Sequence, residues 1–344
     1  MATTDVLRGG AVTLPVGAPT GIGSLPHLDR DAAVDFVLAH TPELPAMPTC
    51  PALDPLELML PQAAWAIRGV EIGSDGTISI PDPGRLDPDA ALGDPELSGA
   101  PFATWRRFLE RIAGRTGPVK LQVTGPLTLG TTLAQAGAPA DVAYAVAARA
   151  VGARVRNLLD LADLRAPDVS RLLVFDEPAL VGGLRPELPL VADDVIDVLS
   201  GALAAAEGRA MTGVHCCGPT DWRLVLQAGP DLLSLPVGAG VADSVGAVSA
   251  FLERGGWIAW GAVATDGPLG EGPSWPWRQL SSQWCELVQQ GCDPVLLRRQ
   301  ALVTPVCGLA HHDEVQAEQV FAITRRLAEK VHDQVMGVRL SVGA

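Results

Sequence analysis

Short apolar runs of four to seven residues alternate along the chain with longer segments in which apolar residues recur about every 3.6 positions. Such runs are typical of buried parallel strands, and the longer segments are typical of amphipathic helices. The runs predict strands at Gly21–Leu25, Ala46–Thr49, Val119–Thr124, Leu172–Asp176, Met211–His215, Leu232–Pro236, Trp257–Val263 and Leu302–Val306. The longer segments predict helices at Arg30–His40, Pro55–Ile67, Thr104–Thr116, Ala140–Ala162, Ala192–Ala206, Asp221–Ala228, Val245–Arg254, Arg278–Gln290 and Asp313–Val335. This alternation predicts the α/β class, and specifically a single (β/α)8 TIM barrel over residues 1–344.

Three parts of the chain depart from this alternation. Residues 1–18 form an N-terminal extension ahead of the first predicted strand. Gly69–Ile80 has the pattern of a β-hairpin around an Asp-Gly turn, and Pro81–Ala100 is rich in Pro, Asp and Gly. We expect this hairpin and loop insertion, residues 69–100 between strands two and three, to cover one end of the barrel together with the Gly267–Trp277 loop.

The composition is that of a globular protein, because 48% of the residues are hydrophobic and only 19% are charged. The net charge of −14 leaves no basic stripe for a phosphate backbone, so we expect no nucleic-acid partner. Neither of the two lysines, Lys120 in a strand pattern or Lys330 in an amphipathic helix, stands among other candidate catalytic groups, which argues against Schiff-base chemistry. Neither a signal-peptide core nor a run of about 18 apolar residues is present, so we expect a cytoplasmic protein with no membrane partner.

Reactive side chains gather where the predicted strands end. Because the carboxyl ends of barrel strands meet on one face, polar residues there predict a site even when they are far apart in sequence. In chain order these residues are Gly23 and Ser24, Asp176 and Glu177, His215, Cys216 and Cys217, Asp266, and Cys307.

His215, Cys217 and Cys307 supply one imidazole and two thiols, a set of ligands that Zn²⁺ favours. Three protein ligands leave a fourth position open, in which a thiol substrate would be held as a thiolate. The alternative is that these residues are buried parts of the strand ends. Strand alternation turns Cys216 away from the site, and His311 and His312 have the positions of solvated or capping residues.

Asp176 and Glu177 follow an apolar strand that cannot easily bury two unpaired carboxylates, so we expect at least one to face the site. The alternative is a carboxylate satisfied by loop amides or by an arginine. The Gly23-Ser24 turn can present backbone N–H groups to an anion such as a substrate carboxylate, or it can simply be a tight turn.

Five motifs occur in a characteristic order: GIGSLPH at 21–27, TGPLTL at 124–129, FDEPAL at 175–180, HCCG at 215–218 and TPVCGL at 304–309. Together they resemble the C-terminal catalytic barrel of cobalamin-independent methionine synthase, within the superfamily that includes uroporphyrinogen decarboxylase. The resemblance covers about residues 19 to 335 and is that of a short form with only the core barrel.

The resemblance implies zinc held by His215, Cys217 and Cys307, with homocysteine as the thiol substrate. It implies that Asp176 binds the substrate's amino group and that Gly23 and Ser24 bind its carboxylate, and we add Glu177 as a substrate-binding candidate. Pro236 stands where the family has a further zinc-ligand Glu, and Asp266 lies near the position of its proton-donating His. The family's second substrate-binding Glu and its folate-stacking Trp have no evident counterparts.

These observations predict a zinc-dependent S-methyltransferase that most closely fits the conversion of homocysteine to methionine, with Asp266 and Asp176 as catalytic residues. The sequence does not distinguish between three methyl donors: methyl-folate, a methyl-corrinoid protein and a small methylated cofactor. One alternative is a zinc-dependent alkyltransferase that acts on another thiol or electrophile. Another is a non-catalytic barrel that binds zinc or a ligand. Porphyrinogen decarboxylation fits less well, because it needs cationic groups that these strand ends lack.

Overall fold

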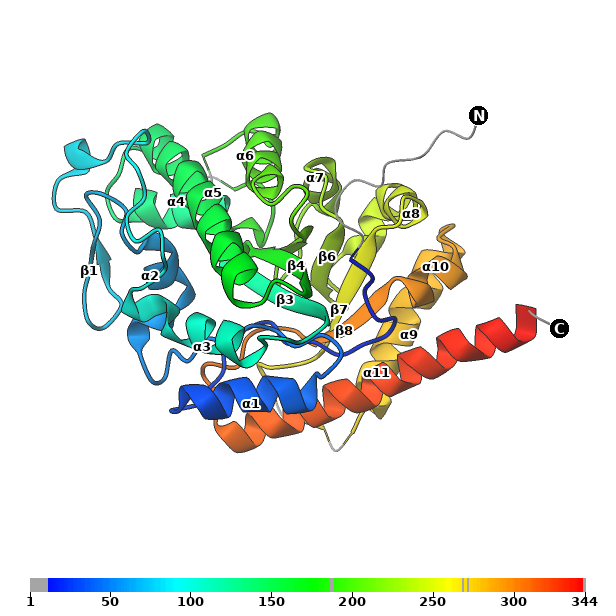
Figure 1. The fold of residues 1–344 in the computed structure, drawn as a ribbon. Helices are drawn as coiled ribbons and strands as arrows, with labels where there is room; N and C mark the ends of the chain where they lie inside the picture. Colours follow the sequence, from blue (N-terminus) through cyan, green and yellow to red (C-terminus); the bar gives the residue numbers. More distant parts are fainter. Residues whose placement is uncertain (1–11, 186–188, 268, 271, 343–344) are drawn as a thin grey trace, which may run out of the picture.

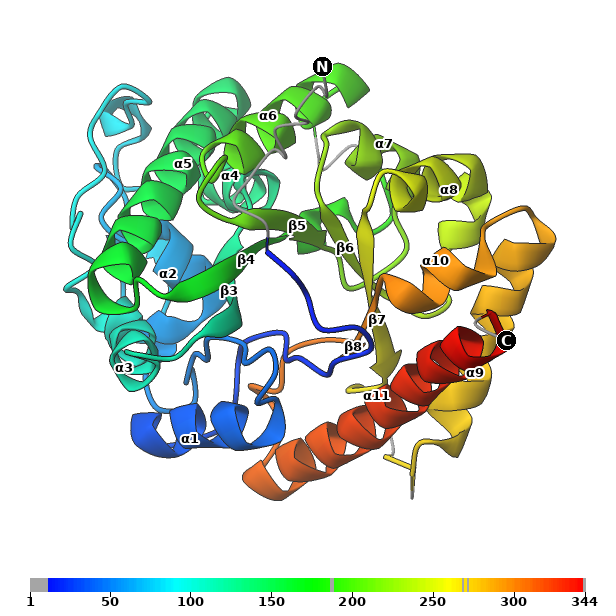
Figure 2. The same cartoon turned by 45° about the vertical axis from the view of Figure 1, so that its right-hand side comes forward.

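The centre of the molecule is a curled parallel sheet with helices on its outer side (Figures 1 and 2). The computed structural model describes residues 12–185, 189–267, 269–270 and 272–342. Six strands follow one another in chain order: β3 (Gly117–Thr124), β4 (Val169–Asp176), β5 (Met211–His215), β6 (Leu232–Pro236), β7 (Trp257–Val263) and β8 (Ala301–Pro305). The sheet confirms the α/β class. The strands are apolar along most of their length because both faces of the sheet are covered.

The segments predicted as strands one and two are not regular strands, which corrects that part of the prediction. They form isolated parallel bridges, Pro19 to Val303, Ser24 to Thr49 and Ala46 to Lys120. Prolines at 19, 26, 45 and 48 remove backbone donors from these segments, so a continuous ladder cannot form. The segments still lie against the two edges of the six-stranded sheet, since Thr20 N–H donates to the Val303 carbonyl at 3.0 Å and Met47 N–H to the Lys120 carbonyl at 2.8 Å.

Eleven α-helices occur in the described part of the chain. They are α1 (Arg30–His40), α2 (Met59–Ala64), α3 (Ala103–Arg111), α4 (Pro126–Gln135), α5 (Ala140–Arg165), α6 (Ala192–Ala204), α7 (Trp222–Gln227), α8 (Val245–Glu253), α9 (Ser274–Gln289), α10 (Pro294–Arg299) and α11 (Glu314–Val342). The sequence prediction misses α4 and α10. The sequence of α4 contains Gly130 and three threonines, a composition more typical of a loop than of a helix. Gly130 is needed because a Cβ there would overlap the Tyr144 ring of α5.

The interior of the curled sheet and its outer side form two separate apolar cores. The inner core is made by Leu14, Ala18, Leu44, Leu172, Val174, Leu232, Ala259 and Leu302. Leu14 and Ala18 belong to the segment predicted as an extension, so residues 12–18 help to fill the interior; residues 1–11 lie outside the described part. The larger core lies between the sheet and the helices.

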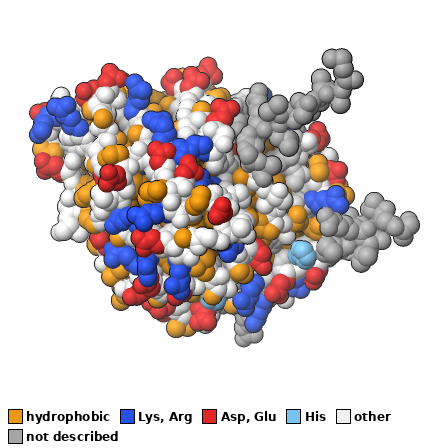
Figure 3. All heavy atoms as spheres, viewed as in Figure 1, with side chains coloured by type: hydrophobic (Ala, Val, Ile, Leu, Met, Phe, Trp, Pro, Cys, Tyr) orange, Lys and Arg blue, Asp and Glu red, His pale blue; other side chains and the backbone are white. Residues whose placement is uncertain are grey.

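The insertion contains the predicted hairpin, formed by β1 (Glu71–Ile72) and β2 (Ile78–Ser79). Asp75 stabilises its turn by accepting a hydrogen bond from Thr77 N–H at 3.0 Å. The Gly267–Trp277 loop falls partly outside the described residues. Among the described helices, none has both the length and the apolar character needed to cross a membrane. On the face shown in Figure 3, arginines and lysines are interspersed with acidic side chains.

Candidate functional site

A cavity of about 260 Å³ lies at the carboxyl ends of the strands. It brings together six of the predicted residues: Gly23, Ser24, Asp176, His215, Cys217 and Cys307. The remaining lining comes from Ile22, Thr49, Pro51, Glu57, Leu58, Met59, Gln62, Gln122, Val123, Thr124, Pro178, Gly308, Ala310 and His311. The cavity lining therefore combines polar side chains with apolar ones, among them Leu58 and Met59.

The Gly23-Ser24 segment is held by its carbonyls rather than by its amides. Thr49 N–H donates to the Gly23 carbonyl at 3.3 Å, and Leu309 N–H donates to the Ser24 carbonyl at 2.8 Å. Within the described residues, the N–H groups of Gly23 and Ser24 have no acceptor. A Cβ on Gly23 would overlap the side-chain amide of Gln122, so a larger residue there would require this amide to move. Two free N–H groups beside a cavity can bind a carboxylate.

His215 ends β5 with its imidazole buried in the cavity wall. Its Nδ1 lies 2.9 Å from the Ser234 hydroxyl of β6, which fixes the ring and leaves Nε2 for another contact. Burial, with a smaller contribution from the nearby Lys120 cation, lowers the pKa of His215 to about 3. The imidazole is therefore neutral at physiological pH, the form that can coordinate a metal ion.

Cys217 and Cys307 line the same cavity, although they come from loops that follow different strands. Their proximity lowers the pKa of the Cys217 thiol and raises the pKa of the Cys307 thiol. Cys216 differs from both. It is buried, its sulfur lies 3.6 Å from the Gly218 carbonyl, and burial raises its pKa to about 11. Cys216 is absent from the cavity lining, as the alternation predicts.

The fit of a zinc ion depends on both the chemistry and the placement of these donors. The chemistry fits, because His215 is neutral with Nδ1 held by Ser234, and two thiols line the same cavity. In the placement shown, however, no group of three or more His, Cys, Asp or Glu side chains in the described residues is arranged to hold a metal ion. Zinc binding would therefore require the donors of His215, Cys217 and Cys307 to come closer together.

Asp176, at the end of β4, lines the cavity, and its Oδ1 is buried without a hydrogen-bond partner in the described structure. Burial raises the pKa of Asp176 to about 7, and the positive charge of Lys120 opposes this rise. A buried carboxylate oxygen with no donor is suited to receive one from a ligand, such as an ammonium group.

Glu177 is predicted to bind substrate, but its carboxylate is hydrogen-bonded to residues of α4 instead. Its carboxylate accepts hydrogen bonds from Leu127 N–H at 2.9 Å, from Thr128 N–H at 2.7 Å and from the Thr128 hydroxyl at 2.6 Å. Glu177 thus binds the N-terminal turn of α4 and is fully buried outside the cavity lining. Burial raises the pKa of Glu177 to about 7, while these hydrogen bonds oppose the rise.

Two further predicted positions also lie away from the cavity lining. Asp266 is exposed in the loop after β7, although its charge contributes to the raised pKa of Cys307. Pro236, where the sequence resemblance leads one to expect a Glu, is half-buried at the end of β6. His311, by contrast, lines the cavity, although its position in the sequence favours a solvated or capping role.

The structure also reveals polar groups that sequence reasoning missed. Glu57 lines the cavity, but its carboxylate is already paired with Arg30 at 3.0 Å and with the Cys50 N–H at 2.8 Å. Lys120 lies inside the sheet near Asp176 and His215, which corrects its assignment as remote from catalytic groups. The sequence does contain a signal for this position: Lys120, Gln122 and Thr124 alternate along β3, and alternate residues of a strand share a face.

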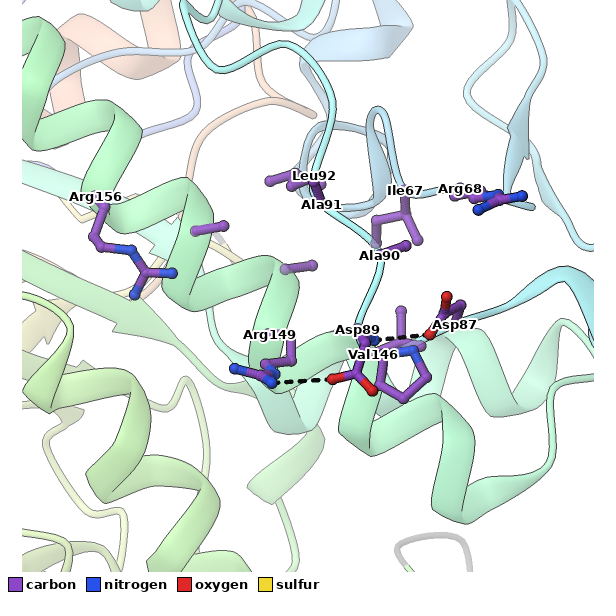
Figure 4. A pocket seen from close by; sticks show the side chains of 13 residues that line it. Ile67, Arg68, Asp87, Asp89, Ala90, Ala91, Leu92, Val146, Arg149 and Arg156 are labelled. Carbon is purple, nitrogen blue, oxygen red and sulfur yellow. Dashed lines mark hydrogen bonds and ion pairs between the residues drawn. The ribbon is translucent and has the colours of Figure 1, made fainter.

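A second hollow of about 200 Å³ lies between α5 and residues 87–92 (Figure 4). Its Arg149 pairs with Asp89 at 3.1 Å, and both side chains are highly exposed. The residues that line this hollow include none of the predicted site residues. The cavity at the strand ends is therefore the candidate site.

Comparison with known proteins supports the fold. No protein-family model and no curated protein sequence matches the chain. Among solved structures, "Putative Vitamin-B12 Independent Methionine Synthase from Listeria monocytogenes" is similar, with a TM-score of 0.57 and 13% sequence identity. The match covers 88% of this chain and 86% of that chain. A Cellulomonas fimi endo-β-1,4-mannanase double mutant gives a TM-score of 0.38 at 13% identity, over 64% of this chain and 57% of that chain. The first likeness shows a shared fold, and the second is too low to support an argument.

Proposed function

We propose that the chain is an enzyme of the methionine synthase type that activates a small thiol, homocysteine, on zinc and transfers a methyl group to its sulfur. The observation that carries this proposal is the meeting of His215, Cys217 and Cys307 with Asp176 around one cavity. Thiol, imidazole and carboxylate groups come from three different strand ends, which is how active sites are built in (β/α)8 barrels. We also propose that the fold is an eight-stranded barrel in which prolines interrupt the first two strands.

The placement of the free polar groups suits an amino acid that carries a thiol. The N–H groups of Gly23 and Ser24 are available for its carboxylate, and Asp176 is available for its ammonium group. When bound, zinc would lower the pKa of the substrate thiol so that it reacts as a thiolate. His215, Cys217 and Cys307 would hold the ion, with Ser234 fixing the imidazole.

The apolar part of the cavity lining receives the methyl donor in this proposal. The apolar lining residues include Pro51, Leu58, Met59, Val123 and Pro178, and the cavity lining contains neither lysine nor arginine. An anionic folate tail would therefore find no cation among the lining residues. A donor whose reacting part is uncharged fits this surface better, and exclusion of water there would favour reaction at the thiolate.

Zinc content provides the first test. We expect about one zinc ion per chain after reconstitution, measured by plasma mass spectrometry, and the loss of tight binding in Cys307→Ser and Cys217→Ser. Cys285→Ser is the matched control, because Cys285 is exposed on α9 and outside the cavity. X-ray absorption on addition of homocysteine should show one more sulfur ligand on the ion.

Product analysis then tests the reaction. Mass spectrometry should detect methionine when homocysteine is supplied with a suitable methyl donor. A protein that binds no zinc, or that loses zinc equally in the Cys285 control, would contradict the metal assignment. Zinc with an unchanged sulfur count in the presence of every thiol would favour the non-catalytic alternative.

A further inference from the structure

Lys120 is a buried cation directly beneath the candidate site. Its side chain is 2% exposed, and its ammonium donates to the Ile22 carbonyl at 2.6 Å and to the Gln122 side-chain oxygen at 3.4 Å. Ile22 immediately precedes the Gly23-Ser24 turn. The ammonium therefore connects β3 to the segment that carries the two free backbone N–H groups.

Gln122 extends this connection to the turn itself. Its side-chain N–H donates a hydrogen bond to the Met47 carbonyl, and its side-chain oxygen accepts one from the Lys120 ammonium. The same amide packs so closely against Gly23 that no Cβ fits between them. Loss of the Lys120 contact would release one end of Gln122, and with it the support beneath Gly23.

The charge of Lys120 also acts on the carboxylate expected to bind the substrate's amino group. Lys120 and Asp176 lie on the inner face of adjacent strands, since Lys120 pairs with Leu172 and Thr124 with Asp176 in the β3–β4 register. The ammonium favours the ionised form of the Asp176 carboxyl group, against the effect of burial. A buried charge is tolerated only when it is paired or hydrogen-bonded, and Lys120 supplies the nearby opposite charge.

We propose that Lys120 is a positioning residue that prepares the site for the amino-acid end of the thiol substrate, by supporting the Gly23-Ser24 turn and by balancing the charge of Asp176. This inference rests on the proposed function. Lys120 acts through these groups and does not touch the reacting sulfur. Its effect should therefore appear in the recognition of amino and carboxylate groups and not in the binding of a bare thiol.

Calorimetric titration of the zinc-loaded protein with two thiols tests this inference. Homocysteine carries both recognition groups, whereas 2-mercaptoethanol carries neither. In Lys120→Met we expect the affinity for homocysteine to fall about 10-fold or more, because a buried charge loses its partner. The affinity for 2-mercaptoethanol should change by less than about 2-fold, because the metal ligands are intact. Lys120→Arg, which keeps the charge, should recover part of the loss.

Arg171→Met is the matched control, because Arg171 is a second buried cation but pairs with Asp163 on the outer side of β4. It should reduce stability without changing the ratio of the two thiol affinities. An unchanged ratio in Lys120→Met would overturn the inference, and Lys120→Gln provides the same comparison if the Met variant does not fold. Failure of the wild-type protein to bind homocysteine would instead reject the proposed function.

Discussion

Replacing Thr128 with valine tests whether Glu177 is a structural residue rather than a substrate ligand. The Thr128 hydroxyl donates to the Glu177 carboxylate at 2.6 Å and accepts the Ala179 N–H at 3.2 Å. Valine has nearly the same shape but can do neither. A hydrogen bond to a charged group contributes about 1.5–3 kcal/mol, and an unpaired buried N–H costs about 1–3 kcal/mol. Allowing for the gain from burying a methyl group, we expect Thr128→Val to lower the free energy of unfolding by about 3 kcal/mol.

The loss should also depend on pH. Burial raises the pKa of Glu177 to about 7, and the Thr128 hydroxyl stabilises its charged form. Glu177 is charged in the folded protein above that value and protonated below it. Removing the hydroxyl should therefore cost more stability at pH 8 than at pH 6.

Urea unfolding followed by tryptophan fluorescence at pH 8 and pH 6 provides the measurement. Thr132→Val is the matched control, because its hydroxyl only bonds back to the Thr128 carbonyl on the same helix, at 2.9 Å. We expect the control to change stability by less than about 1 kcal/mol. Equal effects of the two substitutions, or a cost of Thr128→Val that is larger at pH 6, would refute the structural role given to Glu177. Homocysteine affinity should be nearly the same in both variants.

Two further predictions concern His215. Ser234→Ala removes the partner of Nδ1 and should weaken zinc binding about 10–100-fold in a chelator competition assay, whereas Ser249→Ala on α8, which removes a hydroxyl bonded to Glu253, should have no effect. In the metal-free protein, burial lowers the pKa of His215 from 6.5 to about 3, so between these values the unfolded chain binds a proton that the folded chain does not. The free energy of unfolding should thus fall with falling pH, by up to about 1.4 kcal/mol per unit from this group, and His215→Gln should remove that part of the slope in urea titrations.

Local signals in the sequence predict many of the regular elements. The bounds of α1 agree with the prediction because Asp29 caps the helix, accepting the Ala32 N–H at 2.8 Å. Helix α4 was missed because its selection depends on tertiary contacts, the carboxylate of Glu177 at one end and the Tyr144 ring against Gly130. Such contacts come from distant parts of the chain and leave no periodic pattern.

The two proline-rich segments show a different limit. Their apolar composition correctly predicts burial beside β3 and β8, since Leu25 and Ala46 are each at most 2% exposed. Composition does not show whether a ladder of hydrogen bonds forms, and the prolines at 19 and 45 reduce the ladder to single bridges. The positions of these segments could be inferred from sequence, but their regularity could not.

For the site residues too, the sequence predicts which segments meet better than it predicts what each side chain contacts. The rule that strand ends converge was sufficient to bring His215, Cys217 and Cys307 to one cavity. It gave Asp176 and Glu177 similar roles, although residues that are neighbours in a strand point to opposite faces. Asp176 accordingly faces the interior, and Glu177 faces α4.

What separates a candidate binding group from a structural one in this cavity is whether its hydrogen bonds are already made within the protein. Glu57 and Glu177 are buried acids near the cavity, but each carboxylate is already paired with donors from its own surroundings. Asp176 keeps an unpaired oxygen, and the turn at Gly23 and Ser24 keeps two unpaired N–H groups. An unpaired buried polar group costs about 1–3 kcal/mol, so a ligand that supplies the missing partners would recover that energy on binding. The residues that carry these groups line the same cavity as Cys217 and Cys307, which is why an amino acid bearing a thiol is the substrate class that we propose.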